Sequence, residues 1–254
     1  MPADPVDLRV ATFNIRNTND RYAERKALLG HAFAAIDADI IGLQEVVFAA
    51  EQQADFLAAN LATSNYFAFD ARSGRDPEFG NAILCRVGEV QAHEELRLAE
   101  GRVAHRILVI LPGNRTLWVA NTHLHHRPAD ENIRLHQARA IAAWMRDAPR
   151  ADGAIVQGDF NAQPTEPAYR AMIESGFESA FRTANGTEPP ATWPSGIQAE
   201  TADIRGEPGC VDYIWVNGSI EVRSATLAGD TAAPADPTLY PSDHFAVVAE
   251  ISLL

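Results

Sequence analysis

The sequence predicts a protein of the α/β (α+β) class in which two mixed β-sheets pack face to face and helices cover their outer faces. Strand-like apolar runs recur along the whole chain, helical patterns separate some of them, and hairpin signals join others. No linker, internal repeat or low-complexity run divides the 254 residues, and a hydrophobic content of 46% is ample for a large core. We therefore expect a single domain spanning residues 1–254.

The first third of the chain has the pattern of a β-α-β unit followed by a helix and a strand. Leu8–Ile15 and Ala38–Val46 are β-rich runs, and the apolar residues of Glu24–Asp37 between them recur at helical spacing. A second helix is expected at Glu51–Ala62 and a further strand at Gly80–Arg86.

The middle of the chain predicts a β-hairpin and then a long helix. Val103–Gly113 and Thr116–Leu124 are extended runs, and the turn-forming residues Pro112, Gly113 and Asn114 lie where they meet. The segment Ala129–Ala148 has the strongest helical pattern, with Asp130 as the expected N-cap.

The last part of the chain alternates strands with loops. A strand is expected at Gly153–Asn161 and a short helix at Pro167–Ser175. A polar loop, Asn185–Gly209, is long enough to suggest a functional role. Three strands are expected to follow it, at Cys210–Val216, Ile220–Ala228 and Ser242–Leu253.

The composition limits which partners the protein is expected to bind and which cellular compartment it is expected to occupy. With 34 acidic and 21 basic residues the net charge is −13, which disfavours binding to nucleic acid or anionic membranes through the whole surface. Cys85 and Cys210 are too few for a disulfide framework, so we expect buried free thiols. The start of the chain has no signal-peptide pattern, and no apolar run approaches the ~20 residues of a membrane span. We expect a cytoplasmic, monomeric protein without a membrane partner.

Polar residues border the predicted strands throughout the chain. They are Asn14, Glu45, His123, Asp159, Asn161, Asp212, Asp243 and His244. Any one of them alone is explained as a turn former or a helix cap. Eight such groups beside buried strands would be costly without partners, so we expect them to converge on one another and on a cation. Carboxylate and amide oxygens suit Mg²⁺ or Mn²⁺, and a histidine beside a carboxylate can donate to a phosphoryl oxygen. These are the ingredients of phosphoester hydrolysis.

Six short motifs carry a resemblance to a known family. "TFNIR", "IIGLQEV", "NTHL", "GDFN", "DYIW" and "SDH" occur in this order across nearly the whole chain. In this order they resemble the motifs of the endonuclease/exonuclease/phosphatase superfamily, which has the DNase-I-like fold. The resemblance implies a four-layered α/β sandwich and hydrolysis of phosphoester bonds with a divalent metal, usually Mg²⁺.

The resemblance also implies a metal site. Glu45 would be the principal ligand, assisted by Asn14 and Asp243. Some nucleases of this fold have an acidic ligand two residues after the first-strand asparagine, where this chain has Arg16. The metal site is then built with fewer carboxylates, or Arg16 meets a substrate phosphate as a planar fork.

The remaining motif residues would carry the catalytic chemistry. Asp159 would position or deprotonate the attacking water, and Asn161 would hold a phosphate oxygen or the nucleophile. Asp159 and Asn161 are expected to point the same way on an extended chain, with a packing residue between them. His244, oriented by Asp212, would contact the scissile phosphate, and His123 would donate to the same phosphate.

The sequence constrains the identity of the substrate less than it constrains the type of reaction. The absence of any basic run favours a small or end-presented phosphoester, and the alternative is a metal-dependent endo- or exonuclease acting on DNA or RNA. Trp193 and His125 are candidate substrate contacts. His123, His125 and His126 leave a zinc site open, although further tetrahedral ligands are absent nearby. A catalytically silent binding protein is disfavoured because the whole motif set is present.

Overall fold

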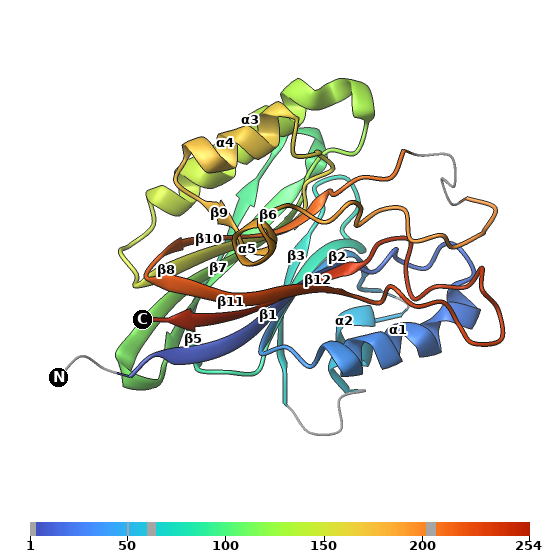
Figure 1. Cartoon of the computed structure of the whole chain (residues 1–254), viewed down its shortest axis with the longest axis horizontal. Coiled ribbons are helices and arrows are strands. Elements are labelled where there is room, and N and C mark those ends of the chain that lie inside the picture. Colours follow the sequence, from blue (N-terminus) through green and yellow to red (C-terminus); the bar gives the residue numbers. More distant parts are fainter. Residues whose placement is uncertain (1–3, 50, 60–64, 202–206) are drawn as a thin grey trace.

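The computed structural model describes residues 4–49, 51–59, 65–201 and 207–254, and within them two six-stranded sheets pack face to face (Figure 1). The first sheet has the order β11-β12-β1-β2-β4-β3 and the second β5-β6-β7-β8-β10-β9. The strands of the first sheet are β1 (Val6–Asn14), β2 (Ile40–Val47), β3 (Phe67–Arg72), β4 (Phe79–Cys85), β11 (Ile220–Ala228) and β12 (Ala246–Leu253). Those of the second are β5 (Glu89–Arg97), β6 (Val103–Leu111), β7 (Arg115–His123), β8 (Gly153–Asp159), β9 (Glu178–Ser179) and β10 (Asp212–Gly218).

Helices cover the outer faces of both sheets. The helices are α1 (Tyr22–Ile36), α2 (Gln53–Ala59), α3 (Glu131–Arg146), α4 (Pro167–Glu174) and α5 (Ala180–Asn185), with short 3-10 turns η1 (Ala99–Gly101), η2 (Pro112–Asn114) and η3 (Pro128–Asp130). In Figure 1, α1 and α2 lie on the side of the first sheet, and α3 and α4 lie on the side of the second.

Three separate apolar clusters fill the three spaces between these four layers. The cluster between the sheets includes Val10 of β1 and Val119 of β7. A second cluster joins α3 and α4 to the outer face of the second sheet, and a third joins α1 and α2 to the outer face of the first. Strands buried on both faces explain the nearly continuous apolar runs in the sequence. The predicted four-layered sandwich is confirmed.

The connectivity brings the ends of six strands to one end of the molecule. β1 and β2 are parallel in the first sheet, and β7 and β8 are parallel in the second, so their carboxyl ends meet. β12 and β10 run antiparallel to β1 and β8, which places their starts at the same end. Residues far apart in the sequence therefore gather where these six strands begin or end.

Some elements differ from the sequence prediction. β3, β5, β9 and α5 were not predicted, and most residues of β3 and β5 are exposed or only partly buried, so they lack a clear apolar pattern. The predicted helix Glu51–Ala62 is present as α2 up to Ala59, and its last three positions lie outside the described residues, as do residues 202–206 of the predicted Asn185–Gly209 loop.

Two further expectations concern the cysteines and membrane spans. Cys85 and Cys210 are free and buried, as predicted. Among the helices that the structure describes, none has the length and apolar character needed to cross a membrane.

Candidate functional site

Three of the predicted site residues lie side by side across the second sheet. His123 at the end of β7 pairs with Asp159 at the end of β8, and Asp159 pairs with Asp212 at the start of β10. Paired positions on neighbouring strands point to the same face of a sheet. All three residues are at most 4% exposed, so two carboxylates and an imidazole share one buried row.

His244 lies over this row and contacts both carboxylates. Its Nδ1 is 2.9 Å from Asp212 Oδ2, and its Nε2 is 3.8 Å from Asp159 Oδ2. Burial opposes the charged imidazolium, but the carboxylates of Asp212, Asp243 and Asp159 raise the pKa of His244 to about 10. His244 is therefore a cation at neutral pH, held between two acids.

Asp159 is the most heavily contacted carboxylate of the site. Its Oδ2 accepts a hydrogen bond of 2.9 Å from Asn14 Nδ2, which joins the two sheets, and lies 3.4 Å from His123 Nε2. Burial and the neighbouring charge of Asp212 raise the pKa of Asp159 to about 7.

Asn161 lies close to Asp159 for a reason that differs from the prediction. The chain does not stay extended: Asn161 has a φ of 47°, and its backbone N–H donates to Asp159 Oδ1 at 2.8 Å. This is the local side-chain to backbone bond that aspartate makes in tight turns. The turn leaves Asn161 on the pocket and buries Phe160 in the cluster under α3 and α4.

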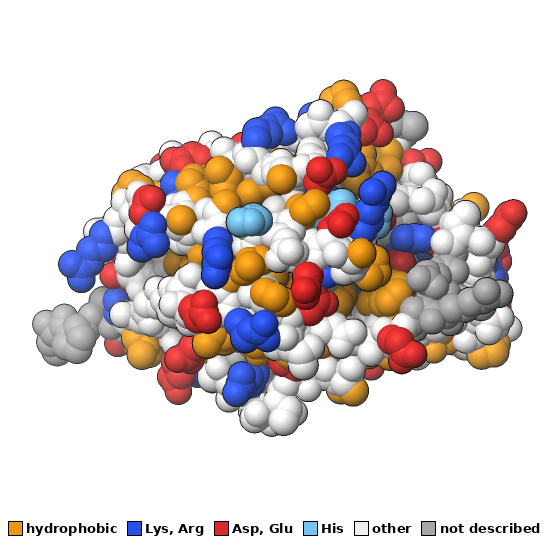
Figure 2. All heavy atoms as spheres, turned by 90° about the horizontal axis from the view of Figure 1, so that it is seen from above, with side chains coloured by type: hydrophobic (Ala, Val, Ile, Leu, Met, Phe, Trp, Pro, Cys, Tyr) orange, Lys and Arg blue, Asp and Glu red, His pale blue; other side chains and the backbone are white. Residues whose placement is uncertain are grey.

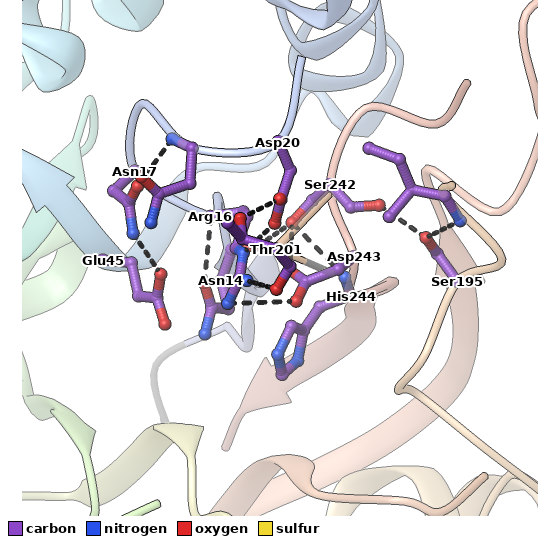
Figure 3. A network of polar contacts seen from close by, with 12 residues as sticks. Asn14, Arg16, Asn17, Asp20, Glu45, Ser195, Thr201, Ser242, Asp243 and His244 are labelled. Carbon is purple, nitrogen blue, oxygen red and sulfur yellow. Dashed lines mark hydrogen bonds and ion pairs between the residues drawn. The ribbon is translucent and has the colours of Figure 1, made fainter. Parts of the chain in front are cut away.

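Glu45 reaches the site because β2 is irregular at this point. The register with β4 shifts between Leu43 and Val46, and Glu45 has a φ of 57°. Such bulges re-aim a side chain. Glu45 Oε2 accepts from Asn17 Nδ2 at 2.6 Å, and burial and the charge of Asp243 raise the pKa of Glu45 (Figure 3).

The guanidinium of Arg16 contacts two carboxylates, those of Asp20 and Asp243. Its Nε donates to Asp20 Oδ2 at 2.6 Å, and its Nη1 lies 3.4 Å from Asp243 Oδ2 (Figure 3). Ser242 Oγ donates to the carbonyl of Asn14 at 2.7 Å, which fixes the segment before β12 against the end of β1.

A fully buried arginine shapes the loop that carries Arg16. The guanidinium of Arg25 in α1 donates to the backbone carbonyls of Ile15, Arg16, Asn17, Asn19, Asp20 and Pro241. Four residues of this loop, Arg16, Asn17, Asp20 and Arg21, have positive φ values. The loop is therefore wound around Arg25, a role that the helical pattern of the sequence does not reveal.

One pocket of about 880 Å³ collects nearly all of the predicted site residues. Its lining includes Arg16, Glu45, His123, His125, Asp159, Asn161, Trp193, Asp243 and His244. Asn14 and Asp212 are buried beside it and hydrogen-bond to Asp159 and His244. The structure thus brings the whole predicted set together.

The three neighbouring histidines have separate partners. His123 faces Asp159, His125 Nε2 lies 2.8 Å from Asp130 Oδ2, and His126 Nδ1 lies 3.0 Å from Arg102 Nη2. Within the described part of the chain they do not gather with other ligands around one point, which argues against the zinc alternative.

Asp159, Asp212 and His244 offer ligand atoms within 4.8 Å of one another, but these groups already partner each other. The oxygens of Asp159 also accept from Asn14 and Asn161. The donor and acceptor atoms of this trio are thus largely engaged with protein partners.

The pocket also contains residues that the sequence did not single out. Asn17, Asn81 and Gln163 line it, and none of them lies in a motif that the sequence analysis uses. Arg75, Arg102 and Arg134 also line the pocket.

The layered fold and the polar groups at one end of both sheets define a protein of the DNase-I-like class. The chain belongs to the endonuclease/exonuclease/phosphatase family, whose model matches residues 11–244.

Individual proteins show the same relationship. The chain is 27% identical over 265 residues to a protein named "Uncharacterized protein YbhP" from Escherichia coli (strain K12), covering 96% of each. It is 28% identical over 160 residues to 2',5'-phosphodiesterase 12 from Mus musculus, covering 54% of this chain and 26% of that protein. The crystal structure of D. rerio TDP2 with a single-strand DNA product superposes with a TM-score of 0.79 at 18% identity, covering 96% of this chain and 98% of that one. This likeness supports the fold.

Proposed function

We propose that this protein hydrolyses a phosphoester bond in a reaction that depends on Mg²⁺ or Mn²⁺, with a small or end-presented phosphoester as substrate. The observation that carries the proposal is the contact series from Asp212 through His244 to Asp159 on a pocket that also exposes Glu45 and Asp243. The family name joins nucleases and phosphatases, which share phosphoester hydrolysis.

The acidic residues of the first sheet fit a hard divalent cation. Glu45 and Asp243 are both on the pocket, and the charge of Asp243 disfavours ionisation of Glu45, a repulsion that a cation relieves. Their donor atoms are oxygens, as Mg²⁺ prefers. We propose that Glu45 and Asp243 hold the ion and that the amide oxygen of Asn14 assists them. When bound, the ion would offset negative charge on a phosphoryl oxygen.

The residues of the second sheet are suited to water activation. A carboxylate whose pKa is near 7 can accept a proton at neutral pH, and we assign this role to Asp159. Asn161, beside it on the pocket, would orient the water or a phosphate oxygen.

The histidines are suited to hold the phosphate. His244, charged and oriented by Asp212, would donate through Nε2 to a phosphoryl oxygen. Burial and the charge of Arg102 lower the pKa of His123, so it would act as a neutral donor.

The charge of the pocket supports a small substrate over a long nucleic acid. Asp76, Glu100 and Glu207 share the lining with its arginines. On the face seen in Figure 2, acidic and basic side chains are interspersed without a continuous basic stripe. A nucleic-acid backbone is tracked by such stripes. Trp193, on the pocket near His244, offers an aromatic face for a ring of the substrate.

A panel of phosphate monoesters, phosphate diesters, nucleotides, inositol phosphates and short oligonucleotides tests this proposal. Purified protein should hydrolyse at least one small phosphoester with Mg²⁺ or Mn²⁺ and lose this activity in EDTA. Undiminished turnover in EDTA would contradict the metal assignment, and cleavage of oligonucleotides alone would favour the nuclease alternative.

A further inference from the structure

Arg102 is a pocket cation whose side chain forms no ion pair with the described residues. It lies directly before β6 on the lining of the site pocket, and the one hydrogen bond of its side chain within the described residues is to His126. The other arginines on the pocket form ion pairs: Arg16 with Asp20, Arg75 with Glu100 and Arg134 with Glu166. Arg102 is half-buried: burial lowers its pKa, and the carboxylates of Asp159 and Glu45 act on it only at longer range than an ion pair. Its guanidinium donors are therefore available for a ligand.

The contact with Arg102 determines the protonation state and the tautomer of His126. A guanidinium only donates hydrogen bonds, so Nδ1 of His126, 3.0 Å from Arg102 Nη2, must accept. The ring is then neutral with its hydrogen on Nε2, in agreement with the lowering of the pKa of His126 by burial and by Arg102. No protein acceptor for Nε2 is found among the described residues, and His126 lines the pocket. Both side chains therefore supply N–H donors to one region of the pocket.

The backbone of Arg102 lies beside the proposed reaction centre, and the charge of its side chain acts on Asp159, Glu45 and His123 without forming an ion pair with them. Ala104 of β6 pairs with Thr122 of β7, and His123 of β7 pairs with Asp159 of β8, so Arg102 precedes a strand that is two positions away from the strand of Asp159. Two strand spacings amount to about 10 Å. A phosphoryl group held at Asp159 and His244 thus leaves the donors of Arg102 and His126 for a second group on the same molecule.

We infer that Arg102 and His126 form an anion subsite that binds a second phosphoryl group of a small substrate. An arginine fork suits a phosphoryl group because it can donate two parallel hydrogen bonds to it. The substrate class is then a small molecule with two phosphoryl groups, one of which is cleaved. The inference rests on the proposed function for the position of the reacting phosphate.

Binding of two matched nucleotides tests the subsite without requiring turnover. Isothermal titration calorimetry in Mg²⁺ compares thymidine 3',5'-bisphosphate with thymidine 5'-phosphate. The bisphosphate should bind about tenfold more tightly to the wild-type protein, and Arg102→Gln should remove this preference. Arg139→Gln, which removes an exposed arginine of α3 outside the pocket, should keep it. Equal affinities in the wild-type protein would overturn the inference.

Kinetics separate the subsite from the reaction centre. The substrates are thymidine 5'-(4-nitrophenyl phosphate) and the same ester with a 3'-phosphate. Arg102→Gln should raise KM for the second ester about tenfold relative to KM for the first. An equal loss of kcat for both esters would place Arg102 at the reacting phosphate and overturn the inference.

The remaining outcomes distinguish the two proposals. Preferential binding of the bisphosphate by a protein that hydrolyses none of the esters would keep the subsite and reject the proposed function. Hydrolysis of the esters without preferential binding of the bisphosphate would keep the proposed function and reject the subsite. Stronger binding of oligothymidylate than of the bisphosphate, abolished by Arg102→Gln, would assign the pair to a nucleic-acid strand and overturn the small-molecule form of the inference.

Discussion

Replacement of Asp212 by asparagine perturbs the proposed mechanism without touching the substrate. Asp212 Oδ2 lies 2.9 Å from His244 Nδ1, and both side chains are buried. The variant removes the charge that supports the imidazolium. Asp212 Oδ1 has no hydrogen-bond partner among the described residues, so an amide NH₂ at that position would be buried without an acceptor from them.

The size of the effect follows from this contact. A buried hydrogen bond to a charged group contributes about 1.5–3 kcal/mol, which corresponds to a loss of about 10- to 150-fold in kcat. The pH dependence should also change. Activity that needs the imidazolium is present below the pKa of His244 and lost above it, so removal of one supporting carboxylate should move the alkaline limb of kcat/KM to lower pH.

The assay is steady-state hydrolysis of bis(4-nitrophenyl) phosphate over a pH series, with thermal unfolding as a check on the fold. Asp130→Asn is the matched control because it alters another His–Asp pair, in which His125 Nε2 lies 2.8 Å from Asp130 Oδ2. The control should keep kcat within about threefold of the wild-type value. Wild-type kcat and an unmoved alkaline limb in Asp212→Asn would refute the assigned role of the pair.

Three further variants test other parts of the structure. Glu45→Gln should raise the Mn²⁺ concentration needed for half-maximal activity by about tenfold or more, because a ligand charge is lost, and an unchanged metal titration would remove Glu45 from the cation site. Arg25→Gln should lower the free energy of unfolding by at least about 3 kcal/mol, since several backbone carbonyls lose their donor, and a urea midpoint equal to wild type would show that the loop does not depend on Arg25. Gly158→Ala should destabilise by about 2 kcal/mol or more, because its Cβ would lie 2.0 Å from the carbonyl oxygen of Thr122, and an unchanged melting temperature would contradict that close approach.

The sequence predicted the buried centre of the fold better than its edges. The buried central strands have clear apolar runs, and the polar residues at their ends stand out against them, as for Asp159 after the run of β8. The edge strand β5 has exposed residues along its length, and β9 is two residues long, so neither has a pattern to find.

The geometry within the site depends on backbone details that residue spacing does not contain. The bulge that turns Glu45 toward the pocket and the turn that places Asn161 both use positive φ values at residues other than glycine. Arg25 has the sequence context of an ordinary helical residue, and its role appears only once the loop is folded around it. The extent of the domain and the catalytic roles remain predictions.

The most direct test of the central claim is the hydrolysis of bis(4-nitrophenyl) phosphate by wild-type protein and by Asp159→Asn, measured side by side with Mg²⁺, with Mn²⁺ and with EDTA. The wild type should turn over the substrate only with a metal, and the variant should lose about 100-fold or more of this activity. The melting temperature of the variant should stay at or above that of the wild type because a buried charge is removed. Equal rates for the two proteins, or full activity in EDTA, would contradict it.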